Sequence, residues 1–177
     1  MGRVWILVRF WYDSFRRRFG PRGSGVERRF QLPLSRDEIA LVVLSIAEGA
    51  AFTPVQIQKA IFLASEKVSD GFRRDSRYNF QPYDYGPFDS QVYSDVDGLW
   101  KRGLAQINQE PGSRWRTYSA TEGGIAEGRR LAGQLTEEQR VVLGRIVNLV
   151  RSLSFNDLVS AIYRAYPGMR ERSVFRD

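Results

Sequence analysis

The chain has 177 residues, of which 42% are hydrophobic, and it contains neither Cys nor His. The lack of both residue types excludes disulfides, thiol nucleophiles, thiolate zinc sites and Ser-His-Asp catalysis. The net charge is +7, yet residues 1–31 hold eight Arg against two acidic residues, and the rest holds 19 basic and 18 acidic residues. We therefore predict a protein that is not an enzyme and has no cofactor or metal. The composition leaves two kinds of chemistry open, which are a Mg²⁺ site built from carboxylates and acid–base catalysis by Asp or Glu.

The N-terminal segment carries the basic character of the chain. A short apolar stretch at residues 4–8 is interrupted by Arg9 and followed by Arg16–Arg18 and a Gly/Pro/Ser-rich linker. We predict an extension at residues 1–31 ahead of a domain at residues 32–177.

Three interpretations of this extension are open. The first is an amphipathic helix of residues 4–19 that lies on an anionic membrane surface. The second is a basic arm that binds nucleic acid, and the third is a poorly ordered or non-native extension. No small-residue cleavage site follows the apolar stretch, and no apolar run is long enough to span a membrane. A cytoplasmic location is therefore expected.

Two helices are predicted at the start of the domain. Ser35 begins a capping box ahead of an apolar helix that ends near Gly49. Thr53 begins a second capping box, and Pro54 suits the first helical position because its missing N–H costs nothing there. The second helix is expected to run to about Val68, where a polar loop begins.

Residues 80–90 combine tyrosine and phenylalanine rings, two prolines, one glycine and two aspartates. Because proline fixes φ and Gly86 admits a positive φ, a stiff, shaped loop is predicted. Asp89 or Ser90 is expected to cap a third helix that ends at Gly103. The apolar face of this helix is predicted to comprise Val92, Tyr93, Val96, Leu99 and Trp100.

A two-stranded hairpin follows, with strands predicted at residues 104–108 and 115–119 around a Pro-Gly turn. Three further helices are predicted behind caps at Thr121, Thr136 and Ser154. This order of elements predicts a mainly α fold: a compact helical domain with a winged-helix-like two-stranded β-hairpin.

The aromatic segment is the main candidate site, because Tyr rings offer a large contact area at a low entropy cost. The residues predicted to contact a protein partner are Tyr83, Asp84, Tyr85, Phe88 and Tyr93. The alternative is that these rings fill the junction between the second and third helices. Asp89 is best explained as a helix cap, whereas Asp84 has no evident structural role and thus the stronger functional case.

The hairpin offers a second candidate contact. Arg114, Trp115 and Arg116 suit either stacking on nucleic-acid bases or binding of a protein partner. Strand alternation places Trp115 on the face opposite both arginines, so its ring is expected to be packed. Asp95 and Asp97 on the third helix would repel phosphates, which favours protein binding over DNA binding.

Several segments share a family resemblance. Thr53–Leu63 resembles the first signature helix of the Panacea domain, the SocA-like antitoxin family with its YwgA-like relatives. Tyr83–Tyr93 resembles the central motif of that family, which is the most specific part of the pattern. Further similar segments lie at Leu99–Leu104, Tyr118–Gly124 and Phe155–Pro167. The resemblance covers about residues 36–173.

This resemblance implies a non-catalytic bacterial antitoxin-like domain. Such a domain binds a cognate toxin encoded by an adjacent gene, and neutralises it directly or delivers it to a protease. Two alternatives stay open: a winged-helix DNA-binding transcriptional regulator, and a peripheral membrane protein held by residues 4–19. The expected partner is therefore a protein, with nucleic acid less favoured and any membrane contact confined to the N-terminal segment.

Overall fold

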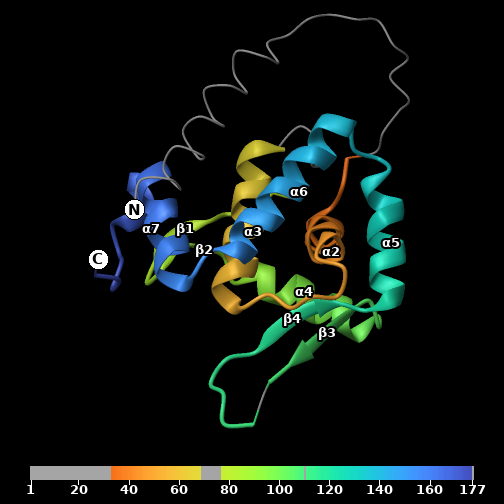
Figure 1. The fold of residues 1–177 in the computed structure, drawn as a ribbon, viewed down its shortest axis with the longest axis horizontal. Helices are drawn as coiled ribbons and strands as arrows, with labels where there is room; N and C mark the ends of the chain where they lie inside the picture. Colours follow the sequence, from red (N-terminus) through yellow and green to blue (C-terminus); the bar gives the residue numbers. More distant parts are fainter. Residues whose placement is uncertain (1–32, 69–76, 110, 177) are drawn as a thin grey trace, which may run out of the picture. The chain divides into compact units, whose positions relative to one another are not determined.

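The computed structural model describes residues 33–68, 77–109 and 111–176 of the chain. Its elements in chain order (Figure 1) are α2 (Arg36–Ile46), α3 (Pro54–Lys67), β1 (Gln81–Tyr83), β2 (Gly86–Phe88), α4 (Gln91–Lys101), β3 (Ala105–Asn108), β4 (Thr117–Ala120), α5 (Glu122–Ala132), α6 (Glu137–Ser152), α7 (Phe155–Ala165) and the 3₁₀ helix η3 (Pro167–Arg170). The predictions for the extension at residues 1–31, and most of the predicted polar loop, fall outside these residues.

The helices begin where the sequence predicts their caps. At the start of α2, the backbone N–H of Ser35 donates at 2.8 Å to the carboxylate of the glutamate three residues on. In the first turns of α3, α5, α6 and α7, a backbone N–H donates to the side chains of Thr53, Thr121, Thr136 and Ser154, respectively. Each such bond satisfies an N–H group that a helix otherwise leaves unpaired, and contributes about 1 kcal/mol.

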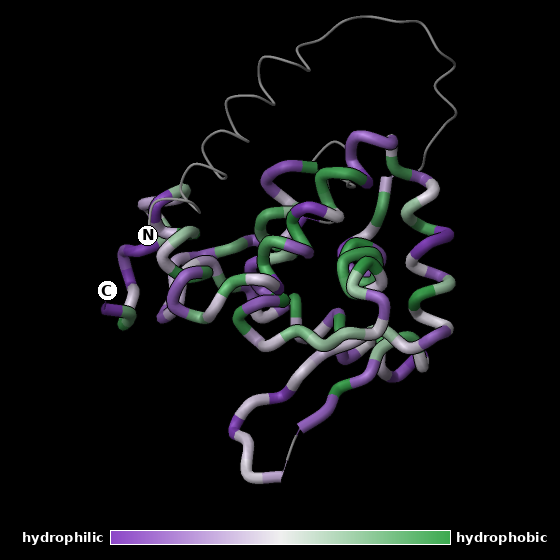
Figure 2. Tube along the Cα trace, viewed as in Figure 1, coloured by the Kyte–Doolittle hydropathy of each residue, from purple (hydrophilic) through white to green (hydrophobic). Residues whose placement is uncertain are grey.

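Helix α2 lies at the centre of the domain and is seen nearly end-on in Figure 1. All seven residues from Ile39 to Ser45 are buried, so the helix is covered on every side rather than along one stripe. Helices α3, α4, α5 and α6 and strand β4 all contact it, and its tube is mostly in the hydrophobic colour in Figure 2. The core is thus built around α2.

Helix α5 approaches α2 closely because it carries glycines at the contact. A Cβ placed on Gly128 would stand 2.3 Å from the Cβ of Ser45 in α2. One placed on Gly124 would stand 1.8 Å from the carbonyl oxygen of Leu104, ahead of β3. No other residue type therefore fits these two positions without a shift of α5.

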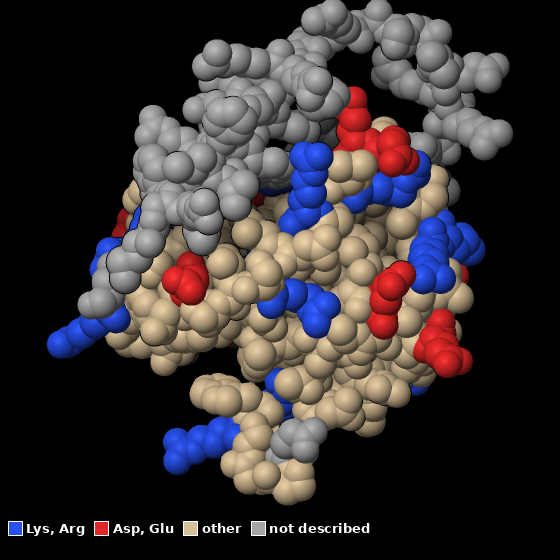
Figure 3. Space-filling model, in the orientation of Figure 1, with Lys and Arg blue, Asp and Glu red and all other residues tan. Residues whose placement is uncertain are grey.

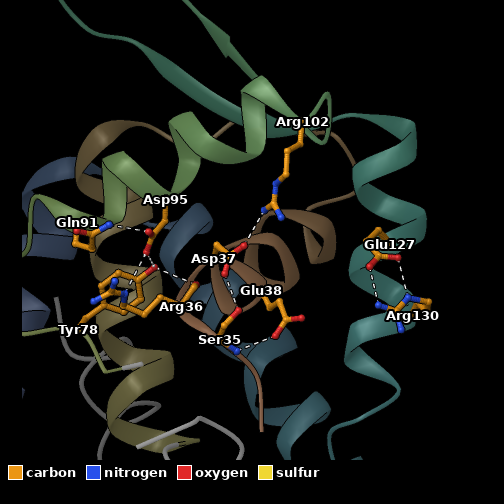
Figure 4. Close-up of polar contacts among 10 residues, drawn as sticks. All are labelled: Ser35, Arg36, Asp37, Glu38, Tyr78, Gln91, Asp95, Arg102, Glu127 and Arg130. Atoms are coloured by element: carbon orange, nitrogen blue, oxygen red, sulfur yellow. Dashed lines mark hydrogen bonds and ion pairs between the residues drawn. The ribbon is translucent and has the colours of Figure 1, made fainter. Parts of the chain in front are cut away.

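A polar network joins α2, α4 and the segment ahead of β1 (Figure 4). Asp95 accepts hydrogen bonds from Tyr78 OH and Gln91 Nε2, both at 2.8 Å, and Arg36 Nε lies 3.7 Å from its carboxylate. The side chain of Asp95 is only 11% exposed, so the network holds this carboxylate inside the fold. Burial, followed by the charge of Asp95, raises the pKa of Tyr78 well above its usual value.

The predicted fold class is confirmed, because the domain is mainly helical and carries the expected hairpin, β3–β4, which we call the wing. The base of the wing is fixed by Phe52, which lies between α2 and α3. The Phe52 N–H donates to Tyr118 O at 2.8 Å, and the Tyr118 N–H donates to Phe52 O at 3.0 Å. One residue of the α2–α3 connection therefore extends the wing sheet.

Residues 80–90, predicted as a loop, instead contain a second antiparallel hairpin, β1–β2. Gly86 has a φ of 97°, which allows the tight turn that brings it opposite Tyr83. Proline usually argues against a strand because it lacks an N–H. Here Pro82 faces Pro87, and alternate pairs of an antiparallel ladder exchange no hydrogen bonds, so both prolines are tolerated.

Candidate partner-binding surface

The β1–β2 hairpin packs on α3, α7 and η3, and these elements lie together on one side of the domain (Figure 1). Gly86 and Pro87 of β2 are buried. A Cβ on Gly86 would stand 3.4 Å from both Lys59 Cε and Tyr163 Cε1, so β2 packs directly on side chains of α3 and α7. This close packing fixes the position of the hairpin on the helices.

A buried cation, Lys59 of α3, lies beneath the hairpin and is only 3% exposed. Its Nζ donates to the carbonyl oxygen of Pro87 at 3.1 Å, and no carboxylate pairs with it among the residues that the structure describes. Burial lowers the pKa of the Lys59 ammonium to about 7, because removal from water penalises the charged form. Lys59 thus anchors β2 to α3, and its charge changes near neutral pH.

The C-terminal segment is bonded to the turn of the hairpin. The carbonyl oxygen of Asp84 accepts from Val174 N at 3.1 Å and from Ser173 Oγ at 3.2 Å. Ser173 Oγ in turn accepts a hydrogen bond from Tyr163 OH of α7 at 2.6 Å. The backbone of the turn is therefore tied to a helix before any partner binds, which lowers the conformational entropy that the turn would lose on contact.

Three of the predicted contact residues form the outer face of this turn. Tyr83 is 51% exposed and Tyr85 is 37% exposed. The carboxylate of Asp84 between them makes no hydrogen bond or ion pair within the described part of the chain. Tyr83 stacks on Phe88 with ring centroids 4.9 Å apart, and Tyr85 meets Phe155 of α7 edge-on at 5.1 Å. Each tyrosine is held by a ring contact while much of its surface stays open to solvent.

The other two predicted contact residues, Phe88 and Tyr93, are half-buried. The Tyr93 ring lies 5.9 Å from that of Phe88 and 5.7 Å from that of Tyr118, and its hydroxyl donates to Pro54 O at 3.3 Å. Burial, with a smaller contribution from Tyr118, raises the pKa of Tyr93 to about 12. Filling the junction between the hairpin, α4 and the wing therefore suits these two rings better than direct contact with a partner.

The aspartates of this region divide into structural and surface groups. Asp89 accepts from Gln91 N at 2.9 Å and from Asn79 N at 2.7 Å, which is the capping role expected of it. Asp95 is held in the polar network at α2, so it presents little charge to solvent. The predicted repulsion of phosphates by α4 is correspondingly weaker, and it rests on Asp97, which lies beside the wing.

The wing residues predicted to contact nucleic acid or a partner are Arg114, Trp115 and Arg116, and all three are exposed. The expected packing of Trp115 is wrong, since 65% of this residue is exposed. The reason is that β4 begins only at Thr117, so strand alternation does not extend to Trp115. These residues stay candidates, but they belong to a different element from the hairpin turn.

The sequence predicted no functional role for three residues that the structure makes prominent: Lys59, Phe155 and Trp100. Lys59 carries a detectable signal, because it is one of three Lys among 27 basic residues and stands within an apolar helix pattern. Phe155 reaches Tyr85 only through the packing of α7. Trp100 was predicted on the buried face of α4, and that prediction is wrong, since Trp100 is 54% exposed.

Within residues 33–68, 77–109 and 111–176, no group of three or more acidic side chains is placed to hold a metal ion. None of the helices in these ranges is both long and apolar enough to cross a membrane. A scan against protein-family models gives no match, and a search of curated proteins gives none either. The resemblance to the Panacea domain therefore stays a prediction that rests on its sequence motifs.

Proposed function

We propose that this chain is a non-catalytic, antitoxin-like domain that binds a protein partner through the outer face of the β1–β2 hairpin. The partner is a toxin encoded by an adjacent gene, which the domain neutralises by direct binding or by delivery to a protease. Binding through the hairpin is supported by the geometry of the turn. The antitoxin role is supported by the resemblance of Thr53–Leu63 and Tyr83–Tyr93 to the Panacea motifs.

The observation that carries the proposal is a pair of exposed tyrosines on a hairpin whose backbone is held at two points. Lys59 bonds to Pro87 O on one side, and Ser173 bonds to the carbonyl oxygen of Asp84 on the other. A surface that is ordered before binding loses little conformational entropy on contact. Tyrosine is also among the residue types that dominate the energy of protein interfaces.

Asp84 indicates the chemistry of the partner. Its carboxylate has no partner within the described residues and lies between two exposed rings. A guanidinium group would satisfy it with a charge-assisted hydrogen bond while stacking on a neighbouring tyrosine. The proposed partner therefore presents an arginine, or less favourably a lysine, within an apolar patch.

Replacing Tyr85 by alanine, or Asp84 by arginine, is expected to weaken partner binding by about 2 kcal/mol, which is roughly a thirtyfold loss of affinity. The fold should persist, because Tyr85 is exposed and the half-buried side chain of Asp84 makes no hydrogen bond or ion pair with a described residue. Each variant is co-expressed with the product of the adjacent gene, and growth rescue and co-purification are measured. The control is Val141→Ala on α6, which removes another exposed apolar side chain and should leave rescue intact.

Two outcomes contradict different parts of this proposal. If both variants keep their helical circular dichroism and still rescue growth and co-purify, the hairpin turn is not the binding surface. If the neighbouring product is harmless when expressed alone, the antitoxin role is wrong, whatever the hairpin binds.

DNA binding by the wing is the second candidate function, and it is favoured by the exposed Trp115 between two exposed arginines. Residues 32–177 carry almost no net charge. We therefore expect the chain without residues 1–31 to bind duplex DNA weakly and without sequence preference at physiological salt. Fluorescence anisotropy with duplexes from its own upstream region and with scrambled duplexes checks this expectation. Sub-micromolar, sequence-selective binding would make the regulator the better proposal.

A further inference from the structure

A groove of about 380 Å³ lies between the C-terminal half of α4 and the wing. Its lining includes Asp97, Trp100 and Lys101 of α4, Ile107 and Asn108 of β3, and Arg116 just ahead of β4. Volumes of roughly 300 to 1,000 Å³ are typical of sites that hold a small ligand or a few side chains. None of these residues belongs to the hairpin turn of the proposed function.

The groove follows from the way the chain leaves α4. Gly103, with a φ of 71°, ends the helix and reverses the chain into β3. The wing then projects from the rest of the domain, as the lobe at the bottom of Figure 3 shows. Tyr93 of α4 stacks on Tyr118 of β4 at 5.7 Å and so joins the two walls. Burial raises the pKa of Tyr118, the positive charge of Arg116 opposes this rise, and the negative charge of Asp97 adds to it.

The groove presents apolar surface and charges that the fold itself does not use. Trp100 is 54% exposed, although a ring of this size is usually buried over most of its area. Lys101 and Arg116 form no ion pair with any residue that the structure describes. Tryptophan and arginine are enriched at interface hot spots, so the exposed Trp100 and the unpaired Arg116 favour a binding role over an inert surface.

We propose that this groove binds an acidic linear segment of a protein, with one of its apolar side chains on Trp100 and Ile107 and its carboxylates facing Lys101 and Arg116. This inference goes beyond the hairpin contact, because the groove and the hairpin turn share no residue. The side chains that line the groove favour a negatively charged ligand, because the two cations, Lys101 and Arg116, outweigh the single carboxylate of Asp97.

A peptide fits this groove better than a nucleic acid, because the peptide backbone brings hydrogen-bond donors. Asp97 accepts hydrogen bonds only, and a peptide backbone supplies N–H groups that satisfy it. The amide of Asn108 both donates and accepts, as a peptide backbone does. The phosphodiester backbone of a nucleic acid supplies acceptors alone and carries a negative charge at every phosphate, so Asp97 would repel it.

The test is an NMR titration of the isotopically labelled full chain with three probes. The first is a capped pentapeptide with a central phenylalanine between pairs of glutamates. The second carries lysines in place of the glutamates, and the third is single-stranded oligothymidylate. We expect the acidic peptide to shift the indole N–H signal of Trp100 with a sub-millimolar Kd, which rises with added salt. The basic peptide should leave this signal in place.

The chain offers matched control variants for the test. Trp100→Ala and Arg116→Glu remove groove residues and should each weaken binding of the acidic peptide about tenfold or more. Val141→Ala and Arg145→Glu, both on α6, remove exposed side chains that do not line the groove. These controls should change the affinity by less than about twofold. All four side chains are exposed, and circular dichroism checks that each variant folds.

Three results would overturn the proposal. One is the absence of any shift of the Trp100 signal at millimolar acidic peptide. Another is equal loss of binding in the groove variants and in the controls. The third is tighter binding of oligothymidylate than of the acidic peptide, which would make the groove a nucleic-acid site. Because the probes are defined peptides, none of these results depends on whether the adjacent gene encodes a toxin.

Discussion

Replacing Gly124 by alanine is expected to destabilise the domain by about 3 kcal/mol or more. The added Cβ would stand 1.8 Å from the carbonyl oxygen of Leu104 and 2.8 Å from its carbonyl carbon. Both are backbone atoms, so no side-chain rotation relieves the overlap. The clash is removed only if α5 moves away from the start of β3, which also opens its contact with α2. Urea denaturation of the wild type and the variant measures the loss.

Two other helical glycines are matched controls for this substitution. A Cβ on Gly144 of α6 meets nothing within 4 Å, and one on Gly123 meets only Thr121 Oγ1 at 3.8 Å. Gly144→Ala should therefore stabilise the domain by about 0.5–1 kcal/mol, because alanine restricts the unfolded chain and favours the helix. Gly123→Ala should change the stability by less than about 1 kcal/mol. If Gly124→Ala behaves like either control, α5 is not held in place by its contact with Leu104.

The stability of the wild type is expected to rise with pH, relative to Lys59→Met, by about 2 kcal/mol between pH 7 and pH 9. Burial lowers the pKa of Lys59 from 10.5 to about 7 in the folded state. Between these two values the unfolded chain binds more protons than the folded one, so folding becomes more favourable as the pH rises. Below about pH 7 the amine is protonated in both states, and this contribution to stability no longer varies with pH.

Lys59→Met removes the titrating group but keeps a flexible apolar chain of similar length in the same space. The difference between the two unfolding free energies therefore isolates Lys59 from the tyrosines, which also titrate at high pH. Urea denaturation at several pH values between 6 and 9 provides the two curves. Parallel curves over this range would mean that Lys59 reaches water in the folded state or is paired there, and that it does not anchor the hairpin as a buried amine.

Much of the secondary structure could be predicted from local sequence. The caps at Ser35, Thr53, Thr121, Thr136 and Ser154 all begin helices where expected. A cap bonds to a backbone N–H within the next three residues, so its effect does not depend on the rest of the fold. The wing strands were also predicted to within two residues, since alternation and a Pro-Gly turn are equally local signals.

The second hairpin could not be predicted, because its prolines are acceptable only in the register that pairs Pro82 with Pro87. A register is a relation between two strands, and single-strand propensities carry no information on it. The same holds for the hydrogen bond between Lys59 and Pro87, whose partners are 28 residues apart. Lys59 is buried because β2 covers it, so its low pKa is a property of the assembled fold.

Tertiary structure alone decided which aromatic residues are exposed at the surface. All five residues of the predicted contact set lie close together in sequence, yet Tyr83 and Tyr85 are exposed while Phe88 and Tyr93 are half-buried. The difference arises from distant elements: Tyr118 of the wing stacks on Tyr93, whereas Phe155 of α7 and Tyr85 form a T-shaped pair. Residue types and spacing determined that an aromatic segment lies between α3 and α4. The exposed part of each ring depends on elements that reach it only when the chain folds, because burial is set by neighbours in space and not in sequence.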